Sequence, residues 1–365
     1  MTPTDRPADF AFVGGGPAAL LAARAVREAR PDASIVVVEP GRPDRDQRTF
    51  ATWTRGPSPF DDVFEVVWDR LFVFGPSGRT VMDLGDMRYG MFSMGRWREA
   101  RQAELEALGV RFVRDRVERI EEDGSVAHLH LDDGELQARL VLDSRPPPIP
   151  EGTLWQFFHG WWVTTPHLAF DTMAPTFMDL QHPIDGALRF WYRLPMSLTR
   201  ALVMAVTVAE APIEAQLDPF LAAYGLRDIQ ILREERGRLP MLPGPWERRT
   251  GDRQLRIGLA GGRLKASTGY GLNRMVADAR AIGDSVARHG HPFDLPQERP
   301  REHWMDAVFL RALREVPEEA PAWFESLARD VPAPRLLRFL DGEASLLDLA
   351  AVASALPLSR FRHWM

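Results

Sequence analysis

The chain has 365 residues, 45% of them hydrophobic, which is enough to bury a large core in one extended unit or two domains. Its formal net charge is −6, and arginine is scattered among acidic residues without a basic block, which argues against nucleic-acid binding. It contains no cysteine, which excludes disulfides, zinc–thiolate sites and a catalytic thiol.

The opening segment, Met1 to Asp9, is polar and lacks the apolar core of a signal peptide. The longest apolar run lies between Ala201 and Ala209, interrupted only by Thr207, and is far shorter than the ~20 residues that a membrane span requires. We therefore expect a cytoplasmic protein whose contact with a membrane, if any, is peripheral and transient. The oligomeric state stays open.

The first forty residues predict one βαβ unit. Residues 10–13 (FAFV) form a short apolar strand, residues 17–30 an alanine- and arginine-rich helix, and residues 35–38 (IVVV) a second strand. Continuous apolar strands around a helix indicate a parallel sheet that is covered on both faces.

The turn inside this unit reads GGGPAA, directly after the first strand. Gly14 permits the tight turn, and Gly16 lets a pyrophosphate approach the backbone. The helix that begins with Pro17 and Ala18 offers free N–H groups and a positive dipole end to the phosphates. Glu39 ends the second strand, where an acid can hydrogen-bond the adenosine ribose. This context predicts dinucleotide binding; the alternative is a glycine turn in an empty unit of the same fold.

The middle of the chain predicts more strand than helix. A short β segment covers 60–85, a helix 96–108, and strands follow near 110–120, 126–131 and 138–142, with a DDG hairpin turn at 132–134. The proline-rich segment 146–150 marks the exit from the first sheet. Residues 154–209 are rich in β-formers and aromatic side chains, and residues 213–224 are predicted to be helical.

A second glycine-rich segment, LAGGRLKASTGYG at 259–271, lies between a predicted strand at 255–260 and a predicted helix at 269–288. Two glycine-rich turns, one near each end of a chain, suit a flavin dinucleotide whose two halves need separate cradles; an ordinary loop is the alternative. After residue 296 the chain is predicted to be helical, with one apolar face formed by Met305, Val308, Phe309, Ala312 and Leu313.

Together these elements predict an α/β fold: a discontinuous Rossmann-like FAD-binding domain, an inserted β-rich substrate domain, and C-terminal helices. The predicted boundaries are 1–60, 86–150 and 230–295 for the FAD-binding domain, 61–85 and 151–229 for the substrate domain, and 296–365 for the helical region.

Tryptophan clusters in the predicted substrate domain, at Trp155, Trp161, Trp162 and Trp191. A wall of indoles can line a cavity for a long apolar polyene, and its π faces can stabilise a carbocation. The alternative is an aromatic core, although the adjacent Trp161 and Trp162 must point to opposite faces of a strand. We predict that these four residues line the substrate site and that at least one belongs to the core.

The histidines predict no metal site. His128 and His130 share one face of a strand next to the DDG turn, where we expect solvent, and His289 and His291 lie in a Gly/Pro loop. The sequence has no G-x-S-x-G elbow, no H-E-x-x-H and no Walker loop.

Several segments between residue 10 and about residue 345 resemble the lycopene cyclases in order and spacing. Besides the opening VGGG, these are RTFATW at 48–53, VLDSRP at 141–146, WQFFHGW at 155–161, FMD at 177–179, YRLPMS at 192–197, GRLPM at 237–241, AGGRLKASTGY at 260–270 and RFLD at 338–341.

The resemblance implies a reduced FAD, with NADPH or NADH as reductant, beside an apolar tunnel that holds the end of a linear isoprenoid. It implies that a carboxylic acid protonates a terminal double bond, that the cation is attacked intramolecularly, and that loss of a proton leaves a ring without net redox change. The residues that it places near the flavin or the rest of the cofactor are Arg48, Gly261, Gly262, Ser267, Thr268 and Gly269.

One strand departs from the family pattern. Met204 stands where the catalytic glutamate of the family is expected, and methionine cannot transfer a proton. Gln181 also replaces an arginine that would pair with Asp179. Asp179 is our candidate for a relocated acid, because apolar neighbours favour a protonated carboxyl; a structural hydrogen-bonding role is the favoured alternative.

The predicted function is therefore a flavin-dependent isoprenoid or carotenoid cyclase with a relocated acid, acting on lycopene or another isoprenoid. The alternative is an FAD-dependent oxidoreductase, such as a reductase, desaturase or hydroxylase, that acts on a lipophilic substrate. A carotenoid-binding protein without turnover is the remaining possibility.

Overall fold

The computed structural model describes residues 6–364, so the expectation for the opening segment lies mostly outside it. The first sheet has the strand order β8-β2-β1-β11-β10-β9, with β17 beside β11. Its strands are β1 (Ala8–Val13), β2 (Ile35–Val38), β8 (Arg111–Val113), β9 (Val117–Glu122), β10 (Ala127–Leu131), β11 (Gly134–Asp143) and β17 (Gln254–Arg256). The pairs within β8-β2-β1-β11-β17 are parallel, and β10 is antiparallel to both of its neighbours.

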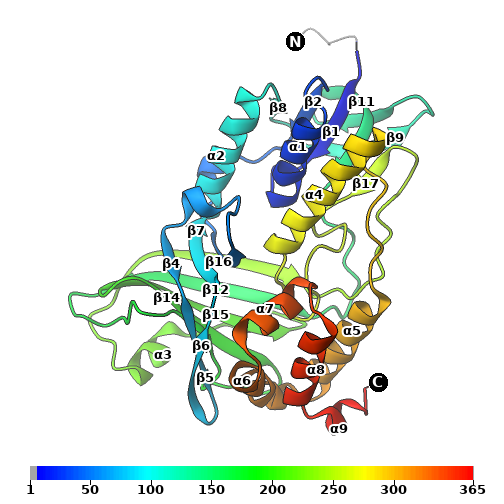
Figure 1. Cartoon of the computed structure of the whole chain (residues 1–365). Coiled ribbons are helices and arrows are strands. Elements are labelled where there is room, and N and C mark those ends of the chain that lie inside the picture. The colour runs from blue at the N-terminus through cyan, green and yellow to red at the C-terminus, as the bar shows by residue number, and fades with distance from the viewer. Residues whose placement is uncertain (1–5, 365) are drawn as a thin grey trace.

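Helices cover one face of this sheet, and on its other face β1 and β2 pack on apolar side chains of β9, β10 and β11. All four residues of β2 are buried. Helix α1 (Pro17–Ala29) packs against α4 (Leu272–His289), and Figure 1 shows the two side by side in front of the sheet. Their contact is close, since a β-carbon added at Gly283 would lie 3.0 Å from the Ala25 side chain. Helix α2 (Met94–Ala107) lies beside α1.

A second sheet has the order β16-β12-β15-β14-β13-β5-β6. Its strands are β5 (Arg70–Gly75), β6 (Gly78–Asp83), β12 (Trp155–Thr164), β13 (Thr176–Asp179), β14 (Leu188–Ser197), β15 (Arg200–Ala209) and β16 (Gln230–Pro240). A small third sheet contains β3 (Thr49–Arg55), β7 (Met87–Ser93) and β4 (Val66–Trp68) in the order β3-β7-β4.

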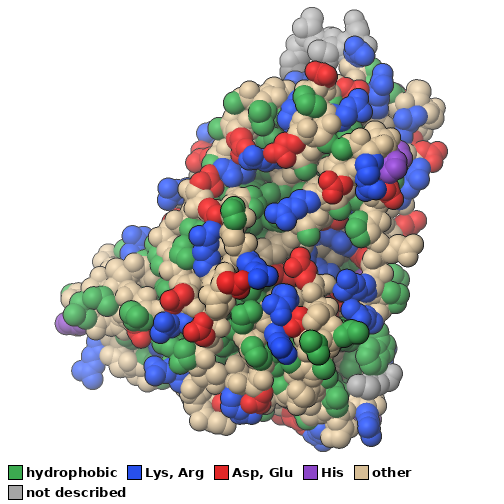
Figure 2. Space-filling model, in the orientation of Figure 1, with side chains coloured by type: hydrophobic (Ala, Val, Ile, Leu, Met, Phe, Trp, Pro, Cys, Tyr) green, Lys and Arg blue, Asp and Glu red, His purple; other side chains and the backbone are tan. Residues whose placement is uncertain are grey.

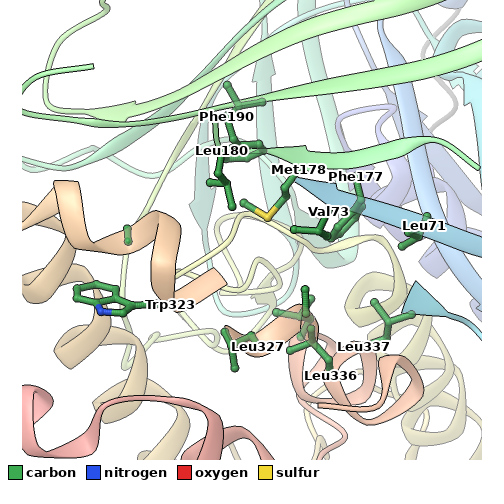
Figure 3. Close-up of a cluster of buried hydrophobic side chains, with 14 of the residues drawn as sticks. Leu71, Val73, Phe177, Met178, Leu180, Phe190, Trp323, Leu327, Leu336 and Leu337 are labelled. Atoms are coloured by element: carbon green, nitrogen blue, oxygen red, sulfur yellow. The ribbon is translucent and has the colours of Figure 1, made fainter. Parts of the chain in front are cut away.

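The two faces of the second sheet have different partners. One face packs on α3 (Leu217–Ala223), through side chains that alternate along β12 and β15 and through Trp191 of β14. The other face joins the largest apolar core, whose second wall is built by the C-terminal helices. These helices are α5 (Pro300–Glu315), α6 (Ala320–Asp330), α7 (Ala333–Asp341), α8 (Leu346–Ala355) and α9 (Leu358–Phe361). Figure 3 shows Phe177 and Met178 of the sheet opposite Leu327 and Leu336 of the helices.

The predicted α/β fold class is confirmed, and most predicted elements lie within a few residues of their expected positions. Two details differ. Strand β16 pairs with β12 in the second sheet, whereas the predicted boundaries assign residues from 230 onward to the FAD-binding domain. The predicted strand at 255–260 ends at Arg256, because the chain turns at Gly258, which has a φ of +62°.

The surface agrees with the mixed charge of the sequence. Figure 2 shows acidic and basic side chains interspersed over the visible face. Within residues 6–364 no helix has both the length and the apolar composition needed to cross a membrane.

Candidate functional site

The first glycine turn is shaped for glycine and open at its helix end. Gly14 has a φ of +99°, and a β-carbon there would collide with the hydroxyl of Ser144, which donates a 2.6 Å hydrogen bond to the carbonyl of Val13. At Gly16, by contrast, an added β-carbon would meet no atom within 4 Å. Helix α1 begins at Pro17 without a side-chain cap. Its first N–H groups therefore face an open surface that fits a phosphate.

Glu39 lies directly over this turn and is held there by an arginine that the sequence analysis missed. The Glu39 carboxylate accepts a 2.6 Å hydrogen bond from the N–H of Gly15, and Arg98 Nη2 lies 3.5 Å from it. Arg98 is 7% exposed; it also donates to the carbonyl of Gly15 and pairs with Asp46 at 3.1 Å. Asp46 in turn pairs with Arg48 at 2.7 Å. One arginine in a charged helix gives no sequence signal for this positioning role.

The second glycine-rich segment forms a closed turn between the two halves of the molecule. The N–H of Gly269 donates to the carbonyl of Lys265 at 2.7 Å, and the N–H of Lys265 donates to that of Tyr270 at 2.7 Å. The buried ammonium of Lys265 pairs with Asp306 of α5 at 2.6 Å, which ties the turn to the C-terminal helices. The hydroxyl of Thr268 is buried and has no hydrogen-bond partner among residues 6–364, so it is available to a ligand.

The two earlier glycines of this segment shape the chain. Gly261 packs against the backbone of Arg256 and Ile257, and Gly262, with a φ of +71°, packs against the indole of Trp246. Neither glycine lines either of the two cavities described next.

Two cavities meet at this turn. The larger cavity, of about 390 Å³, lies between the second sheet and the C-terminal helices, and its lining is almost entirely apolar. Figure 3 shows part of its wall, including Val73 and Phe190. The smaller cavity, of about 200 Å³, lies between β3, the second sheet and the turn. Gln156, Thr268 and Tyr270 line both cavities.

A group of aromatic side chains separates the two cavities. Tyr270 stacks on Phe177 with ring centroids 6.0 Å apart and meets Trp53 edge-on at 4.7 Å. The hydroxyls of Tyr270 and Tyr192 lie 3.1 Å apart. Burial raises the pKa of Tyr192 to about 12, so its hydroxyl stays neutral over the physiological range. The boundary between the cavities is thus rich in π faces and carries no charge of its own.

The four predicted tryptophans line neither cavity, and this prediction is wrong. Trp161 stacks on Trp191 at 6.0 Å, and Trp191 stacks on Phe220 of α3 at 4.1 Å, on the far face of the second sheet. Trp162 is core on the other face, and Trp155 is half-buried beside Phe157. The expectation that at least one tryptophan belongs to the core is confirmed.

The two candidate catalytic positions lie on opposite faces of the second sheet. Met204 lines the smaller cavity, as expected for the family position. Asp179 is fully buried on the α3 face, where it accepts a hydrogen bond from the hydroxyl of Tyr224 and lies 3.6 Å from Arg193. Arg193 therefore pairs with Asp179 in place of the arginine that Gln181 replaces. Asp179 lines neither cavity, so the structure favours its structural role over the relocated acid.

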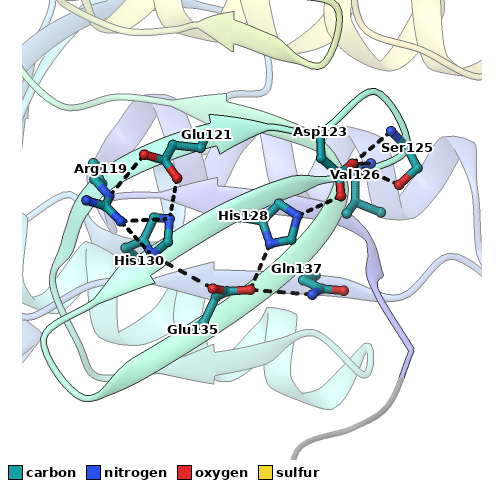
Figure 4. Close-up of polar contacts among 9 residues, drawn as sticks. All are labelled: Arg119, Glu121, Asp123, Ser125, Val126, His128, His130, Glu135 and Gln137. Atoms are coloured by element: carbon teal, nitrogen blue, oxygen red, sulfur yellow. Dashed lines mark hydrogen bonds and ion pairs between the residues drawn. The ribbon is translucent and has the colours of Figure 1, made fainter.

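The histidines form ion pairs on the surface. His128 lies 2.9 Å from Asp123 and 2.8 Å from Glu135, and His130 lies 3.0 Å from Glu121, all on the edge of the first sheet (Figure 4). In the described part of the chain, no group of three or more His, Asp or Glu side chains is arranged to hold a metal ion.

A family model described as "lycopene cyclase protein" matches residues 9–363. The chain belongs to the lycopene cyclase family. A lycopene beta-cyclase from Pseudescherichia vulneris is 27% identical over 380 residues, covering 96% of this chain and 94% of that protein.

Solved structures show the same fold at low identity. A geranylgeranyl bacteriochlorophyll reductase-like protein from Thermoplasma acidophilum has a TM-score of 0.65 at 13% identity, covering 99% of this chain and 100% of that chain. A flavoprotein/dehydrogenase from Cytophaga hutchinsonii has a TM-score of 0.62 at 14% identity, covering 96% and 99%. The resemblance that the sequence motifs indicated is confirmed by the family match.

Proposed function

We propose that this protein is a flavin-dependent cyclase of the lycopene cyclase type, which closes a ring at the end of a linear isoprenoid or carotenoid without net redox change. Family membership and the lycopene beta-cyclase relative support the substrate class. The observation that carries the proposal is the meeting of a long apolar cavity with a smaller, partly polar cavity at the second glycine-rich turn.

The residues fit FAD at both ends. Gly14, Gly16 and the start of α1 at Pro17 and Ala18 would hold the pyrophosphate, because Gly16 leaves open space at an uncapped helix start. Glu39, at the end of β2, would hold the ribose. At the other end the residues are Ser267, Thr268, Gly269 and Arg48, of which Thr268 and Gly269 line the smaller cavity with Arg48. NADPH or NADH would serve as reductant. Reduced flavin, when bound, supplies negative charge next to a developing carbocation.

The larger cavity suits a polyene and protects a cation from water. Its lining offers apolar side chains from the sheet and from α5 to α9. A long hydrocarbon is therefore more stable in this cavity than in water. The aromatic rings of Phe177 and Tyr270 stand where the two cavities meet. Their π faces would stabilise positive charge at the end of the chain. Exclusion of water there prevents the cation from forming an alcohol.

The lining of the larger cavity includes partly exposed apolar side chains of the C-terminal helices, which supports a membrane as the source of the substrate. Trp304 and Leu358 both line the cavity and are about half exposed, at 48% and 43%. Leu346 and Leu347 at the start of α8 are 75% and 70% exposed, and Figure 2 shows hydrophobic side chains gathered over this helical region. We propose that these helices touch a bilayer transiently while the protein remains cytoplasmic.

The rival function is an FAD-dependent oxidoreductase on a similar lipophilic substrate. The presence of Met204 at the family's glutamate position favours it, because methionine cannot transfer the proton that ring closure requires. Anaerobic incubation of the purified protein with FAD, NADPH and lycopene in liposomes, followed by chromatography and mass analysis, separates the two. A cyclic product of unchanged mass, formed without stoichiometric NADPH consumption, is expected. A product whose mass changes with each NADPH consumed contradicts the cyclase and supports the oxidoreductase.

A further inference from the structure

The smaller cavity contains a carboxylic acid that the family pattern does not explain. Among the residues that the structure describes, Glu235 of β16 supplies the only carboxyl in the lining of this cavity. The larger cavity also has one acidic lining residue, Asp306, but its carboxylate is paired with the ammonium of Lys265 at 2.6 Å. Glu235 is therefore the acid with access to the space where Met204 stands.

The register of the second sheet brings Glu235 and Met204 together. Gly160 of β12 pairs with Met204 of β15 on one side and with Glu235 of β16 on the other. The three residues thus form one row across the sheet, with the side chains of Met204 and Glu235 on the same face. A β-carbon added at Gly160 would lie 2.9 Å from Met204 Cε and 3.1 Å from Glu235 Cγ. Because Gly160 has no side chain, the two neighbouring side chains meet above it.

One oxygen of the Glu235 carboxyl is anchored and the other is free. Oε2 accepts hydrogen bonds from the N–H of Thr49 at 3.1 Å and from its hydroxyl at 2.9 Å, and Arg233 Nη1 lies 3.3 Å away. Oε1 is buried and has no hydrogen-bond partner within residues 6–364. The side chain as a whole is 7% exposed. A lining carboxyl that is fixed through one oxygen, and whose other oxygen lies unpaired near the indole of Trp162, keeps a group that can carry a proton beside the cavity.

The burial of Glu235 shifts its pKa upward. Burial raises the pKa of Glu235 above its usual value, while contacts with Thr49, Arg233 and Trp162 act in the opposite direction. A raised pKa increases the fraction of the carboxyl that carries a proton near neutral pH, which a general acid requires.

The structure assigns to Glu235 the role of proton donor and acceptor that Met204 cannot perform; this assignment rests on the proposed cyclase function. The Oε1–H group adds its proton to the terminal carbon–carbon double bond, which leaves a tertiary cation and a carboxylate. A second double bond of the same chain attacks the cation, forming the ring bond and moving the charge into the ring. The carboxylate then removes a ring proton, so that the product is an isomer of the substrate and the acid is regenerated.

The neighbouring Glu234 provides a matched control. It lies on the same strand but points to the opposite face, where its carboxylate lies 3.0 Å from His159 and is 47% exposed. The test compares ring formation from lycopene in liposomes, with FAD and NADPH, by the wild type, Glu235→Gln, Glu234→Gln and the double variant Met204→Glu/Glu235→Gln. The bound flavin content and the thermal midpoint of each variant are measured in parallel, to establish that it is folded.

We expect Glu235→Gln to lose at least about 100-fold in turnover with normal flavin content, and Glu234→Gln to stay within about threefold of the wild type. The double variant should regain activity, because it returns a carboxyl to the family position across Gly160. A Glu235→Gln variant that cyclises as fast as the wild type overturns the assignment while leaving the cyclase function intact. A wild type that forms no ring under any of these conditions overturns the proposed function, and the assignment with it.

Discussion

Asp341, in the RFLD segment at the end of α7, gives the sharpest test of the energetics of this fold. Its carboxyl accepts a 2.6 Å hydrogen bond from the indole of Trp53 and lies 3.1 Å from the amide nitrogen of Asn273. Burial raises the pKa of Asp341 from 3.8 to about 7, the nearby Glu343 adds to the rise, and the hydrogen bonds oppose it. The group therefore joins β3, α4 and α7 in a form that prefers to keep its proton.

This shift makes stability fall as the pH rises. Between pH 4 and pH 7 the native protein holds a proton on Asp341 that the unfolded chain has released, so the contribution is complete below about pH 4 and is lost as the pH rises through 7. At about 1.4 kcal/mol per pH unit, the change amounts to at most about 4 kcal/mol. With an unfolding entropy of about 2 cal/mol/K per residue over a chain of this length, the thermal midpoint should move by about 5 °C.

The assay is thermal unfolding of the wild type and of Asp341→Asn at half-unit intervals from pH 4 to pH 7.5. The amide cannot titrate, so the wild type should lose about 5 °C relative to the variant across this range. Asp348→Asn is the control without a pH dependence in this range: Arg338 and Ser345 hold the pKa of Asp348 well below its usual value of 3.8, so its contribution is lost only below about pH 4, and the difference between this variant and the wild type should stay nearly constant from pH 4 to pH 7.5. A difference between the wild type and Asp341→Asn that does not change with pH would refute the reasoning.

Three further predictions concern the two glycine-rich turns and the second sheet. Lys265→Met leaves Asp306 buried without its partner and should destabilise the protein by about 3–5 kcal/mol in denaturant unfolding; a loss below about 1 kcal/mol contradicts the buried pair. Gly16→Ala should fold with reduced flavin content. Gly14→Ala should fail to fold, because of these two glycines only Gly14 lacks room for a β-carbon and has a positive φ. Equal flavin contents in the two purified variants would contradict this prediction. Asp179→Asn should lower the thermal midpoint but keep ring formation, and a folded variant without turnover would restore Asp179 as the acid.

The sequence predicted the parts of this protein that depend on local backbone chemistry. Gly14 has a φ of +99°, which favours glycine, and a glycine between an apolar strand and a helix can be recognised from a few adjacent residues. The apolar run of β2 similarly indicated a strand buried on both faces. The loss of the glutamate at Met204 was visible for the same reason, since it is a change at one position of a motif.

What the sequence by itself determined is therefore the fold class, the family, and the positions of the two glycine-rich turns. Only the tertiary structure decided which face of each strand meets a cavity. Alternation along a strand divides its side chains into two sets, but it does not tell which set faces a cavity when both faces of the sheet are covered. Trp161 and Trp191 were therefore predicted to line the substrate site, whereas they pack on α3. Glu235 and Met204 meet for the same kind of reason: strands distant in sequence are placed on either side of Gly160 by hydrogen bonds that no local pattern records.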